Sequence, residues 1–337
     1  MTKKLFVKKL LQWNKTHNHR TMPWKGEKNP YFIWLSEIIL QQTRVEQGLE
    51  YYLKFIKEFP TVSHLADASE DKVMRLWQGL GYYSRARNLH ASAKIVQHEH
   101  VGIFPNNYED ILKLKGIGKY TAAAISSFGF NLPHAVVDGN VIRVLSRVFG
   151  IKIAYDTAKG IEEFNALAHD LLDCKNPGVY NQAIMDFGAI ICMPTNPNCM
   201  QCVMHKDCEA NQQNIVKELP VKNKRITLKK RYFIFKLWIK KEKICIEKRE
   251  EKDIWRNLYQ FPLEEIGEKK FNSYDEKEFT QKLTHQKIHA KFIYEEGANT
   301  AISAQSWVDI KCLNNFGFPK IICTFIESNN LKIDRHV

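Results

Sequence analysis

The sequence lacks an apolar run of the roughly 20 residues that a membrane-spanning helix needs. Its first stretch, MTKKLFVKKLLQWNK, has neither a long apolar segment nor a small-residue cleavage site, so we expect no secretion signal. No arginine precedes Arg20, which is unlike a transit peptide. The stretch instead predicts a surface helix whose inward face carries Leu5, Val7, Leu10, Leu11 and Trp13.

Cysteine is too scarce for a disulfide framework, because the 337 residues contain only 8. Four of these are scattered and predict ordinary buried thiols: Cys174, Cys245, Cys312 and Cys323. The other four lie close together in CMPTNPNCMQCVMHKDC. This distribution favours a reducing interior, so we expect a cytoplasmic protein.

Acidic residues are outnumbered, since 50 Lys and Arg stand against 37 Asp and Glu and the net charge is +13. Such an excess favours a polyanionic partner, nucleic acid before a membrane surface. Hydrophobic residues make up 44% of the chain, which is enough for two domains with cores of their own. Charge and composition do not specify the fold.

Apolar residues at helical spacing dominate the chain up to about residue 211, without strand alternation. A proline and serine break in FPTVSHLADAS separates two of the expected helices. The predicted helices cover residues 31–40, 49–59, 71–77, 86–97, 108–114, 120–128, 141–149, 161–172 and 180–191.

The pattern changes after residue 211. The polar and basic segment ELPVKNKRITLKKR carries Pro220 and predicts a linker. Beyond it, RYFIFKLWI places apolar residues at every second position (Phe233, Phe235, Leu237, Ile239), the period of a strand with one buried face. KEKICIEKRE is a candidate hairpin partner for that strand, and IHAKFIYEE alternates again. We therefore predict an α+β second domain.

The clustered cysteines follow the spacing C-x6-C-x2-C-x5-C: Cys192, Cys199, Cys202 and Cys208. Four thiolates on so short a loop can wrap one metal centre. Zinc and a [4Fe–4S] cluster both accept four cysteines, and thiolate softness alone does not separate them. The spacing, at the end of a helical region, resembles the cluster loop of the endonuclease III superfamily of DNA glycosylases, and this implies a [4Fe–4S] cluster.

The segment LKLKGIGKYTAAAISSF predicts a helix, a tight turn at Gly116 and Gly118, and a second helix of small residues. Such a turn exposes the amides at the second helix's N-terminus, which can bind a phosphate without reading sequence. A plain helix–helix turn is the alternative, but Lys113, Lys115 and Lys119 around the turn favour the phosphate. The stretch resembles the helix-hairpin-helix of the same superfamily.

Two carboxylates differ in their surroundings. Glu37 lies within the apolar run of WLSEIILQQT, and desolvation there would raise its pKa. Asp138, in VVDGNVIRVLSR, precedes a predicted helix, where a capping role is the simplest interpretation and the helix N-terminus favours the anion. One protonated and one ionised acid is the pair that glycosidic cleavage requires.

The chain as a whole resembles the MutY family of adenine DNA glycosylases. The matching motifs run in order through MPWKGEKNPYFIWLSEIILQQTRVE, WQGLGYYSRARNLH, LKGIGKYTAAAI, VVDGNVIRVLSR and NQAIMDFGAIIC to the four-cysteine loop. The second domain resembles a MutT-like (Nudix) lesion-recognition domain through IWRNLYQFP, LTHQKIHA and WVDI, without the Glu-rich helix of a Nudix hydrolase. We expect that domain to bind and not to hydrolyse.

The resemblance implies a multidomain fold: an all-α helix-hairpin-helix glycosylase domain with a [4Fe–4S] loop, then a smaller α+β MutT (Nudix)-like domain. We expect a helical catalytic domain at residues 1–211, a linker at 212–228 and a lesion-recognition domain at 229–337. Within the first, a six-helix module would span about 30–134. A cluster module would combine 1–29 with 135–211.

The resemblance also assigns site residues. Glu37 would protonate adenine at N7 and help to activate water, Asp138 would stabilise the oxocarbenium ion, and Tyr120 and Asn140 would line the same pocket. Residues that would contact DNA are Gln42, Leu80, Tyr82, Gly116, Gly118 and Lys119. Thr284 and His285 would recognise the lesion in place of the family's F-S-H motif, from which Leu283 and Thr284 depart. The four clustered cysteines would hold the [4Fe–4S] cluster.

Tyr120 separates this chain from the glycosylase/lyase members of the superfamily. In those members the same position holds the lysine that forms a Schiff base with the sugar. Lys119 is adjacent, but neighbouring side chains on a helix differ by about 100° in direction, so we expect Lys119 to point elsewhere. The resemblance therefore implies a monofunctional enzyme.

The expected substrate is double-stranded DNA with adenine opposite 8-oxoguanine or guanine, bound by a nucleoid-associated monomer of bacterial type. Replication or repair partners are not specified by the sequence. Two alternatives remain: a glycosylase/lyase acting on oxidised pyrimidines, and a non-catalytic cluster-bearing scaffold that binds DNA. A zinc protein is a third.

Overall fold

The computed structural model describes residues 1–223, 227–295 and 305–329, and the chain divides into two compact units. Unit 1 comprises Met1–Ser63 and Ser92–Arg225, and unit 2 comprises His64–Ala91 and Ile226–Val337. Residues 64–91 thus group with the C-terminal part, while the predicted domain limits stay a prediction. Among the described residues, no helix combines the length and hydropathy that crossing a bilayer demands.

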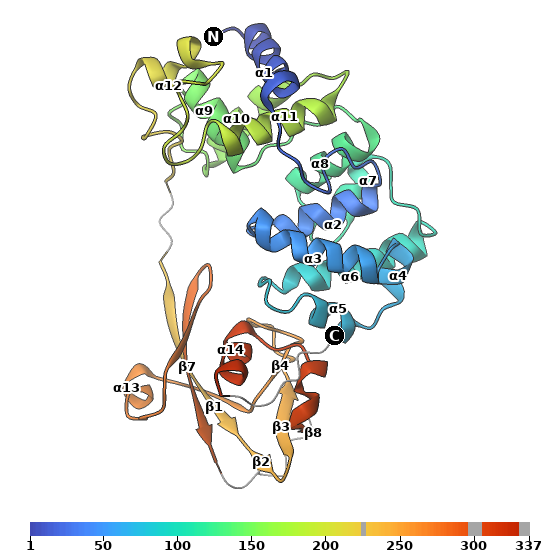
Figure 1. The fold of residues 1–337 in the computed structure, drawn as a ribbon, viewed down its shortest axis with the longest axis vertical. Coiled ribbons are helices and arrows are strands. Elements are labelled where there is room, and N and C mark those ends of the chain that lie inside the picture. The colour runs from blue at the N-terminus through green and yellow to red at the C-terminus, as the bar shows by residue number, and fades with distance from the viewer. Residues whose placement is uncertain (224–226, 296–304, 330–337) are drawn as a thin grey trace. The chain divides into compact units, whose positions relative to one another are not determined.

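Unit 1 is built from helices packed in pairs. Its helices are α1 (Lys3–His17), α2 (Pro30–Leu40), α3 (Val45–Glu58), α7 (Tyr108–Lys113), α8 (Lys119–Phe130), α9 (Gly139–Phe149), α10 (Ala158–Asp170), α11 (Pro177–Ile190), the short η1 (His205–Asp207) and α12 (Glu209–Gln212), together with the C-terminal half of α6 (Ser84–Glu99). In Figure 1, α2 lies beside α8 and α11 beside α9, and these pairs position the site described below.

Local signals explain where several helices begin. Pro30 occupies the first turn of α2, where its missing N–H costs nothing, and the Asn29 side chain accepts a hydrogen bond from the Tyr31 N–H. The inward face of α1 is formed by Phe6, Leu10 and Trp13, so the predicted face was wrong to omit Phe6. Val7 and Leu11 are partly buried against the same core, as predicted, and Leu5 is also partly buried.

The break predicted in FPTVSHLADAS is itself partly helical, because α4 (Val62–Asp67) forms there. Six residues of mixed polarity are too short for helical periodicity to be recognised. The next helix, α5 (Glu70–Leu76), begins at Ser69, whose hydroxyl accepts from the Lys72 N–H.

Unit 2 adds two sheets to α4, α5 and the first half of α6. One sheet has the order β5-β1-β7-β6, and the other has the order β2-β3-β4 with β8 also paired to β3. The strands are β1 (Lys229–Leu237), β2 (Ile239–Lys240), β3 (Lys243–Lys248), β4 (Tyr259–Gln260), β5 (Leu263–Ile266), β6 (Phe279–Lys282), β7 (Gln286–Tyr294) and β8 (Gln305–Asp309); the helices are α13 (Glu268–Phe271), η2 (Ile310–Asn315) and α14 (Lys320–Ser328).

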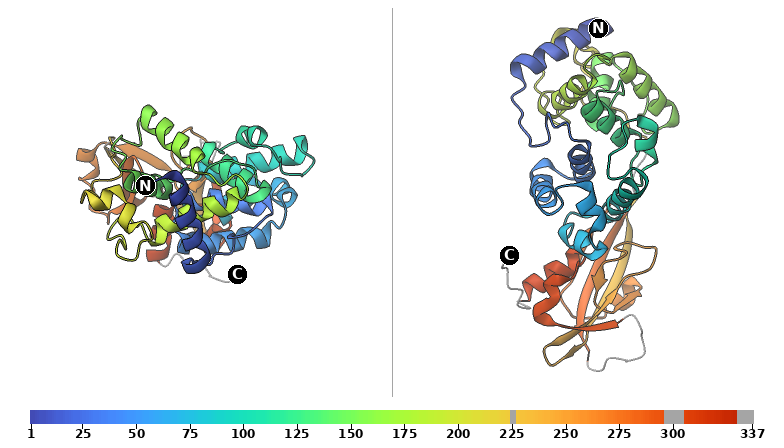
Figure 2. Two further views of the ribbon diagram at one scale, coloured as in Figure 1. Left: turned by 90° about the horizontal axis from the view of Figure 1, so that it is seen from above. Right: turned by 90° about the vertical axis from the view of Figure 1, so that its right-hand side faces the viewer.

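Strand β1 is central and is buried on both faces. It runs parallel to β7 over nine residue pairs, and the two form a long twisted ribbon (Figures 1 and 2). Phe233 and Phe235 face one core, while Tyr232 and Ile234 pack against Phe271 of α13. The prediction of a single buried face was therefore wrong, because a second layer covers the side expected to be wet.

The predicted hairpin between β1 and KEKICIEKRE was also wrong in its partner. Strand β1 pairs with β5 and β7, whereas β3 pairs with the two-residue β2, with β4 and with β8. The chain changes sheets at Trp238, where the Cys245 N–H still bonds the Trp238 carbonyl at 3.0 Å.

The scattered cysteines are not uniformly buried. Cys245 is fully buried and Cys323 is partly buried, but Cys174 and Cys312 are exposed. The expectation of four buried thiols is therefore wrong for those two, which lie in a turn after α10 and in η2. All eight cysteines are free thiols.

Candidate active site

Glu37 lies in the middle of α2 and is 8% exposed. Burial raises the pKa of Glu37 to about 7; a hydrogen bond from the Tyr120 hydroxyl lowers it, and the charge of Asp138 raises it. The apolar run around Glu37 thus has the effect expected of it. The carboxyl group can hold a proton near neutral pH.

Asp138 caps α9, as predicted. Its Oδ1 accepts from the Val141 N–H at 2.8 Å, and its Oδ2 accepts from Asn140 Nδ2 at 2.7 Å. These bonds lower the pKa of Asp138, but burial raises it more strongly, so the pKa lies above its usual range. The helix N-terminus that we expected to favour the anion is therefore opposed by desolvation.

Tyr120 lies in the first turn of α8, hydrogen-bonds Glu37 and is affected by the charges of both acids. Burial raises the pKa of its phenol well above the usual value, and the charges of Glu37 and Asp138 raise it further. The hydroxyl therefore stays protonated and donates to Glu37. The fold brings four predicted site residues together from α2, α8 and the start of α9: Glu37, Tyr120, Asp138 and Asn140.

Arg143 is a residue that sequence reasoning missed. It is 8% exposed, and its Nη2 donates to Asn140 Oδ1 at 2.8 Å and to the Gly188 carbonyl at 2.7 Å. Its Nε donates to the Cys192 carbonyl at 2.6 Å. Arg143 thus links the loop of the first clustered cysteine to the side chain that holds Asp138.

A signal for this role was present in the sequence. VIRVLSRVF places Arg143 and Arg147 one helical turn apart on an otherwise apolar helix. Arginines at such positions are seldom buried unless their guanidinium groups are bonded. Both are buried here, and both donate to backbone carbonyls.

The predicted hairpin forms between α7 and α8. Gly116 has a φ of +79°, a conformation that glycine adopts without strain, and Gly118 is the N-cap of α8. No side chain among the described residues caps α8, and a Cβ at Gly118 would meet nothing within 4 Å. The first amides of α8 are therefore open to an anion. Lys119 is exposed, away from the buried carboxyl groups.

Two residues predicted to contact DNA have left-handed backbones, which is rare without glycine. Gln42 follows α2 with a φ of +56° and is exposed. Tyr82, in the loop before α6, has a φ of +48° and is 44% exposed. Conformations of this kind cluster at functional sites. Leu80 is 6% exposed, so most of its side chain is packed inside unit 2.

The lesion-recognition pair lies at the tip of the β6–β7 hairpin, which the Leu283 N–H closes on the Gln286 carbonyl at 2.7 Å. His285 is exposed and Thr284 is half-buried. Within unit 2, the hydroxyl groups of Thr284 and Tyr82 hydrogen-bond to each other. A predicted DNA-contact residue and a predicted recognition residue are therefore neighbours.

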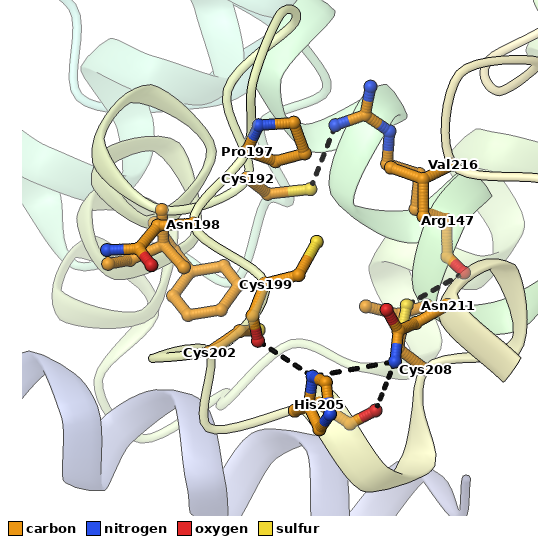
Figure 3. Close-up of a pocket in the computed structure, with 13 residues that line it drawn as sticks. Arg147, Cys192, Pro197, Asn198, Cys199, Cys202, His205, Cys208, Asn211 and Val216 are labelled. Atoms are coloured by element: carbon orange, nitrogen blue, oxygen red, sulfur yellow. Dashed lines mark hydrogen bonds between the residues drawn. The ribbon is translucent and has the colours of Figure 1, made fainter. Parts of the chain in front are cut away.

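The four clustered cysteines line one pocket of unit 1. Figure 3 shows their side chains around a common hollow, with Arg147 beside Cys192 and the His205 ring on another side. The His205 Nδ1 lies 2.8 Å from the Cys199 carbonyl oxygen. In the described parts of the chain, no three His, Cys, Asp or Glu side chains are placed so that they could all coordinate one metal ion.

The donor set of this pocket fits a metal centre. Burial raises the pKa of the Cys202 thiol to about 12 and raises those of Cys192 and Cys208, and the neighbouring sulfurs add to the effect. Thiolates so close together need a compensating cation. Four thiols that share a pocket are chemically suited to a metal, whose positive charge would favour their thiolate forms.

Arg147 holds the first part of the cysteine loop. It is 3% exposed, its Nη1 donates to the Met193 carbonyl at 2.7 Å, and its Nη2 donates to the Pro194 carbonyl at 3.2 Å. Nη1 also lies 3.5 Å from Cys192 Sγ. Donors aimed at a ligand sulfur are a usual element of metal–thiolate sites.

Residues 35–168 match the HhH-GPD superfamily of base excision DNA repair proteins, and residues 234–328 match the NUDIX domain. The first match lies in the helical region and the second spans the sheets of unit 2. The predicted fold class, a helix-hairpin-helix glycosylase domain followed by a Nudix-like domain, is thereby confirmed.

A solved thermostable thymine-DNA glycosylase aligns with a TM-score of 0.58 at 31% identity, covering 63% of this chain and 97% of that one. An endonuclease III in complex with DNA aligns with a TM-score of 0.55 at 18% identity, covering 64% of this chain and 99% of that one, and so supports the fold alone.

Relatives of known name are adenine DNA glycosylases, two of which match the chain over greater lengths than these structures do. An adenine DNA glycosylase of Buchnera aphidicola from Schizaphis graminum is 35% identical over 97% of this chain and 99% of its own length. That of Buchnera aphidicola from Baizongia pistaciae is 41% identical over 78% and 74%. The human adenine DNA glycosylase is 39% identical over 60% and 39%. By these matches, the chain belongs to the adenine DNA glycosylase family of the HhH-GPD superfamily.

Proposed function

We propose that this chain is a monofunctional DNA glycosylase that hydrolyses the N-glycosidic bond of adenine mispaired with 8-oxoguanine or guanine in duplex DNA. The observation that carries the proposal is the pair of Glu37 and Asp138, which interact through their charges and in which Glu37, hydrogen-bonded to Tyr120, has a pKa of about 7. The names of the relatives support adenine as the base. The mispair rests on the motifs of both domains.

Glu37 is the general acid of the proposed reaction. Its proton passes to adenine N7, and the bond between the sugar carbon and the base nitrogen then breaks with both electrons going to adenine. Protonation neutralises the charge that develops on the leaving base. The carboxylate left behind accepts a proton from the attacking water, so that the acid is regenerated.

Asp138 stabilises the oxocarbenium ion formed when adenine leaves. It is the more strongly hydrogen-bonded of the two acids, with donors from Val141 and Asn140, and hydrogen bonds favour its anionic form. Asn140 is fixed in turn by Arg143. The carboxyl group is therefore oriented before substrate binds, and such preorganisation is usually the largest source of electrostatic stabilisation.

Tyr120 supports hydrolysis without a lyase step. A lysine at this position could attack the sugar and form a Schiff base, whereas a phenol kept protonated by burial cannot. Tyr120 instead donates to Glu37 and helps to orient its carboxyl group.

We also propose that Cys192, Cys199, Cys202 and Cys208 hold a [4Fe–4S] cluster. Such a cluster, when bound, supplies four strong iron–thiolate bonds that fix the loop 192–208. Zinc would use the same thiolates, so the metal must be identified directly. Iron and acid-labile sulfide in equal amounts, with brown colour in purified protein, are the expected result. Stoichiometric zinc without sulfide would refute the cluster.

A glycosylase assay on paired lesions tests the function. Single-turnover adenine release should be fastest opposite 8-oxoguanine, slower opposite guanine, and absent from A:T. Duplexes with T:G or with an oxidised pyrimidine complete the panel, because a structural relative is a thymine-DNA glycosylase. Release of thymine or of an oxidised pyrimidine, without release of adenine, would refute the proposal.

Two controls separate the alternatives. Glu37→Gln should abolish release while duplex binding persists, because glutamine keeps the shape and loses the proton. Borohydride should trap little or no covalent adduct, since Tyr120 replaces the lysine. Adduct formation at the level of an authentic lyase would support the glycosylase/lyase alternative. A wild-type protein that binds duplex and releases no base would support the scaffold.

A further inference from the structure

Asn181 is a polar residue in the core of unit 1 whose side chain holds the segment that leads to Asp138. It lies on α11 and is 0% exposed. Its Nδ2 donates to the His134 carbonyl at 2.8 Å and to Ser127 Oγ at 2.9 Å. Its Oδ1 accepts from the Val136 N–H at 3.1 Å. The carboxamide thus bonds to α8 and to the connecting segment.

The segment 131–138 runs from α8 to α9 without regular secondary structure. Asn181 bonds a carbonyl and an N–H that are two residues apart, which is the pair that one residue of a parallel strand engages. The side chain therefore replaces a missing strand neighbour. This arrangement defines which residues of the segment face α11, and so defines its register.

The register at Val136 determines where Asp138 lies. Only one residue separates the two, and Val136 is 1% exposed in a cluster with Ala123 and Ala124, against which Tyr120 also packs. A shift of the backbone at Val136 would move the Asp138 carboxylate relative to Tyr120 and to Glu37, the two groups with which it interacts.

Helix α11 can transmit position because it approaches both neighbouring helices closely. A Cβ at Gly178 would lie 2.8 Å from the Ser127 carbonyl oxygen of α8, and one at Gly188 would lie 2.7 Å from the Asn140 Cβ of α9. Asn181 lies between these two contacts. It is thus the side chain of α11 that bonds the segment between α8 and α9.

We propose that Asn181 is a positioning residue for base excision: its carboxamide sets the register of the segment 131–138 and thereby the place of Asp138 beside Glu37. The inference rests on the proposed glycosylase function. Asn181 touches no reacting atom, and its effect is on the rate of the chemical step and not on the binding of DNA.

The test compares Asn181→Asp and Asn181→Ser with the control Ser127→Ala. Aspartate keeps the shape and the acceptor for Val136 but sets an oxygen against the His134 carbonyl, and serine is too short to reach the segment. Ser127→Ala removes the third hydrogen bond of the same carboxamide and leaves both bonds to the segment. The serine variant keeps the test open if aspartate prevents folding.

Both Asn181 variants should lower the single-turnover rate of adenine release by about 10- to 100-fold, the usual effect of misplacing a catalytic group by about 1 Å. Their affinity for a duplex with an uncleavable adenine analogue should stay unchanged. Hydrogen exchange should rise in residues 131–138. Ser127→Ala should lower Tm and keep the wild-type rate, all rates being measured well below the lowest Tm.

Wild-type rates in Asn181 variants whose segment exchanges faster would overturn the inference. The inference would also be overturned if Ser127→Ala, at the same loss of Tm as the Asn181 variants, released adenine as slowly as they do. If the wild-type protein releases no adenine in the same assay, the proposed glycosylase function is refuted. The wild-type rate thus tests that function, and the variant rates test the role of Asn181.

Discussion

At the scale of single residues, the acidity of Glu37 is a property of its surroundings. An exposed glutamate is ionised at neutral pH and has no proton to give. Burial in α2 removes water from the carboxylate and brings its pKa to about 7, while the Tyr120 hydroxyl limits the rise by stabilising the anion. The two effects together leave a group that can both lose and regain a proton near neutral pH.

The rate of adenine release should therefore depend on pH through Glu37. A general acid works in its protonated form, so the single-turnover rate should be high below pH 7 and should fall as pH rises through the pKa of about 7. A glutamate of ordinary acidity would lose its proton well below neutrality. The measurement is a pH–rate profile between about pH 5 and 9 on a duplex containing A:8-oxoguanine.

Tyr120→Phe is the matched variant for this profile. It removes the hydrogen bond that lowers the pKa of Glu37 and keeps the ring in place. The pKa of Glu37 should rise. Provided that Tyr120→Phe still releases adenine, the falling limb of its pH–rate profile should lie at higher pH than that of the wild type. A limb that stays in place, or moves to lower pH, would contradict the assignment of that limb to Glu37.

The positions of single residues could be predicted from sequence where one motif carries them. Glu37 and Asp138 each lie in a distinct motif, and Asp138 is the N-cap of α9. The sequence carried a signal for Arg143 in its spacing from Arg147. The backbone groups that Arg143 and Asn181 bond could not be predicted, because those groups belong to segments distant along the chain. Spacing within one stretch does not reveal such contacts, which exist only once the helices are packed.

At the scale of elements, α9 bonds the cysteine loop, residues 192–208, and carries Asp138 of the acid pair at its N-terminus. Asp138 caps its first turn, Arg143 bonds Asn140 and the Cys192 carbonyl, and Arg147 bonds the Met193 carbonyl one turn later. Arg143 bonds both the cysteine loop and the side chain that holds Asp138, so we expect a change in the loop to reach Asp138 through Arg143.

Arg143→Lys tests this connection. Lysine keeps the charge but lacks the planar fork that reaches Asn140, Gly188 and Cys192 together. Adenine release per metal-loaded molecule should fall roughly 10- to 100-fold, because Asn140 no longer fixes Asp138. Metal content and single-turnover rate are measured on the same preparations.

Arg147→Lys is the control for that experiment, since Arg147 holds the loop and does not bond Asn140. It should lower metal content and leave the rate per loaded molecule near that of the wild type. If Arg143→Lys lost metal and kept its rate per loaded molecule, the connection to Asp138 would be refuted.

The elements themselves were predictable to different degrees. Helix α9 has a periodic apolar face and followed the sequence closely. Helix α8 is buried continuously over residues 121–127 and was recognised by its small residues after the tight turn. The burial of β1 on both faces was not predicted, because local alternation cannot distinguish a strand covered on one side from one covered on both. Its pairing with β5 and β7 was not predicted either. The six-residue α4 was missed because it is shorter than two helical turns.

At the scale of the whole molecule, the residues proposed for chemistry and those proposed for recognition belong to different units. Glu37, Tyr120 and Asp138 lie in unit 1, and Thr284 with Tyr82 lies in unit 2. Side chains without shared partners contribute almost independently to measured free energies. Changes in unit 2 should therefore alter which mispair is preferred, whereas changes at Glu37 should remove adenine release from every mispair alike.

Thr284→Ala is the variant that tests this division. The Thr284 hydroxyl bonds Tyr82 within unit 2, and we propose it as the group that bonds the lesion base. Losing one hydrogen bond of about 1 kcal/mol should reduce the preference for A:8-oxoguanine over A:G by about fivefold. The A:G rate should change little, because guanine does not use the contact.

Thr284→Ser keeps the hydroxyl and should keep the preference. An equal loss of rate on both duplexes would show instead that Thr284 supports catalysis generally, and the ratio of the two single-turnover rates distinguishes the cases.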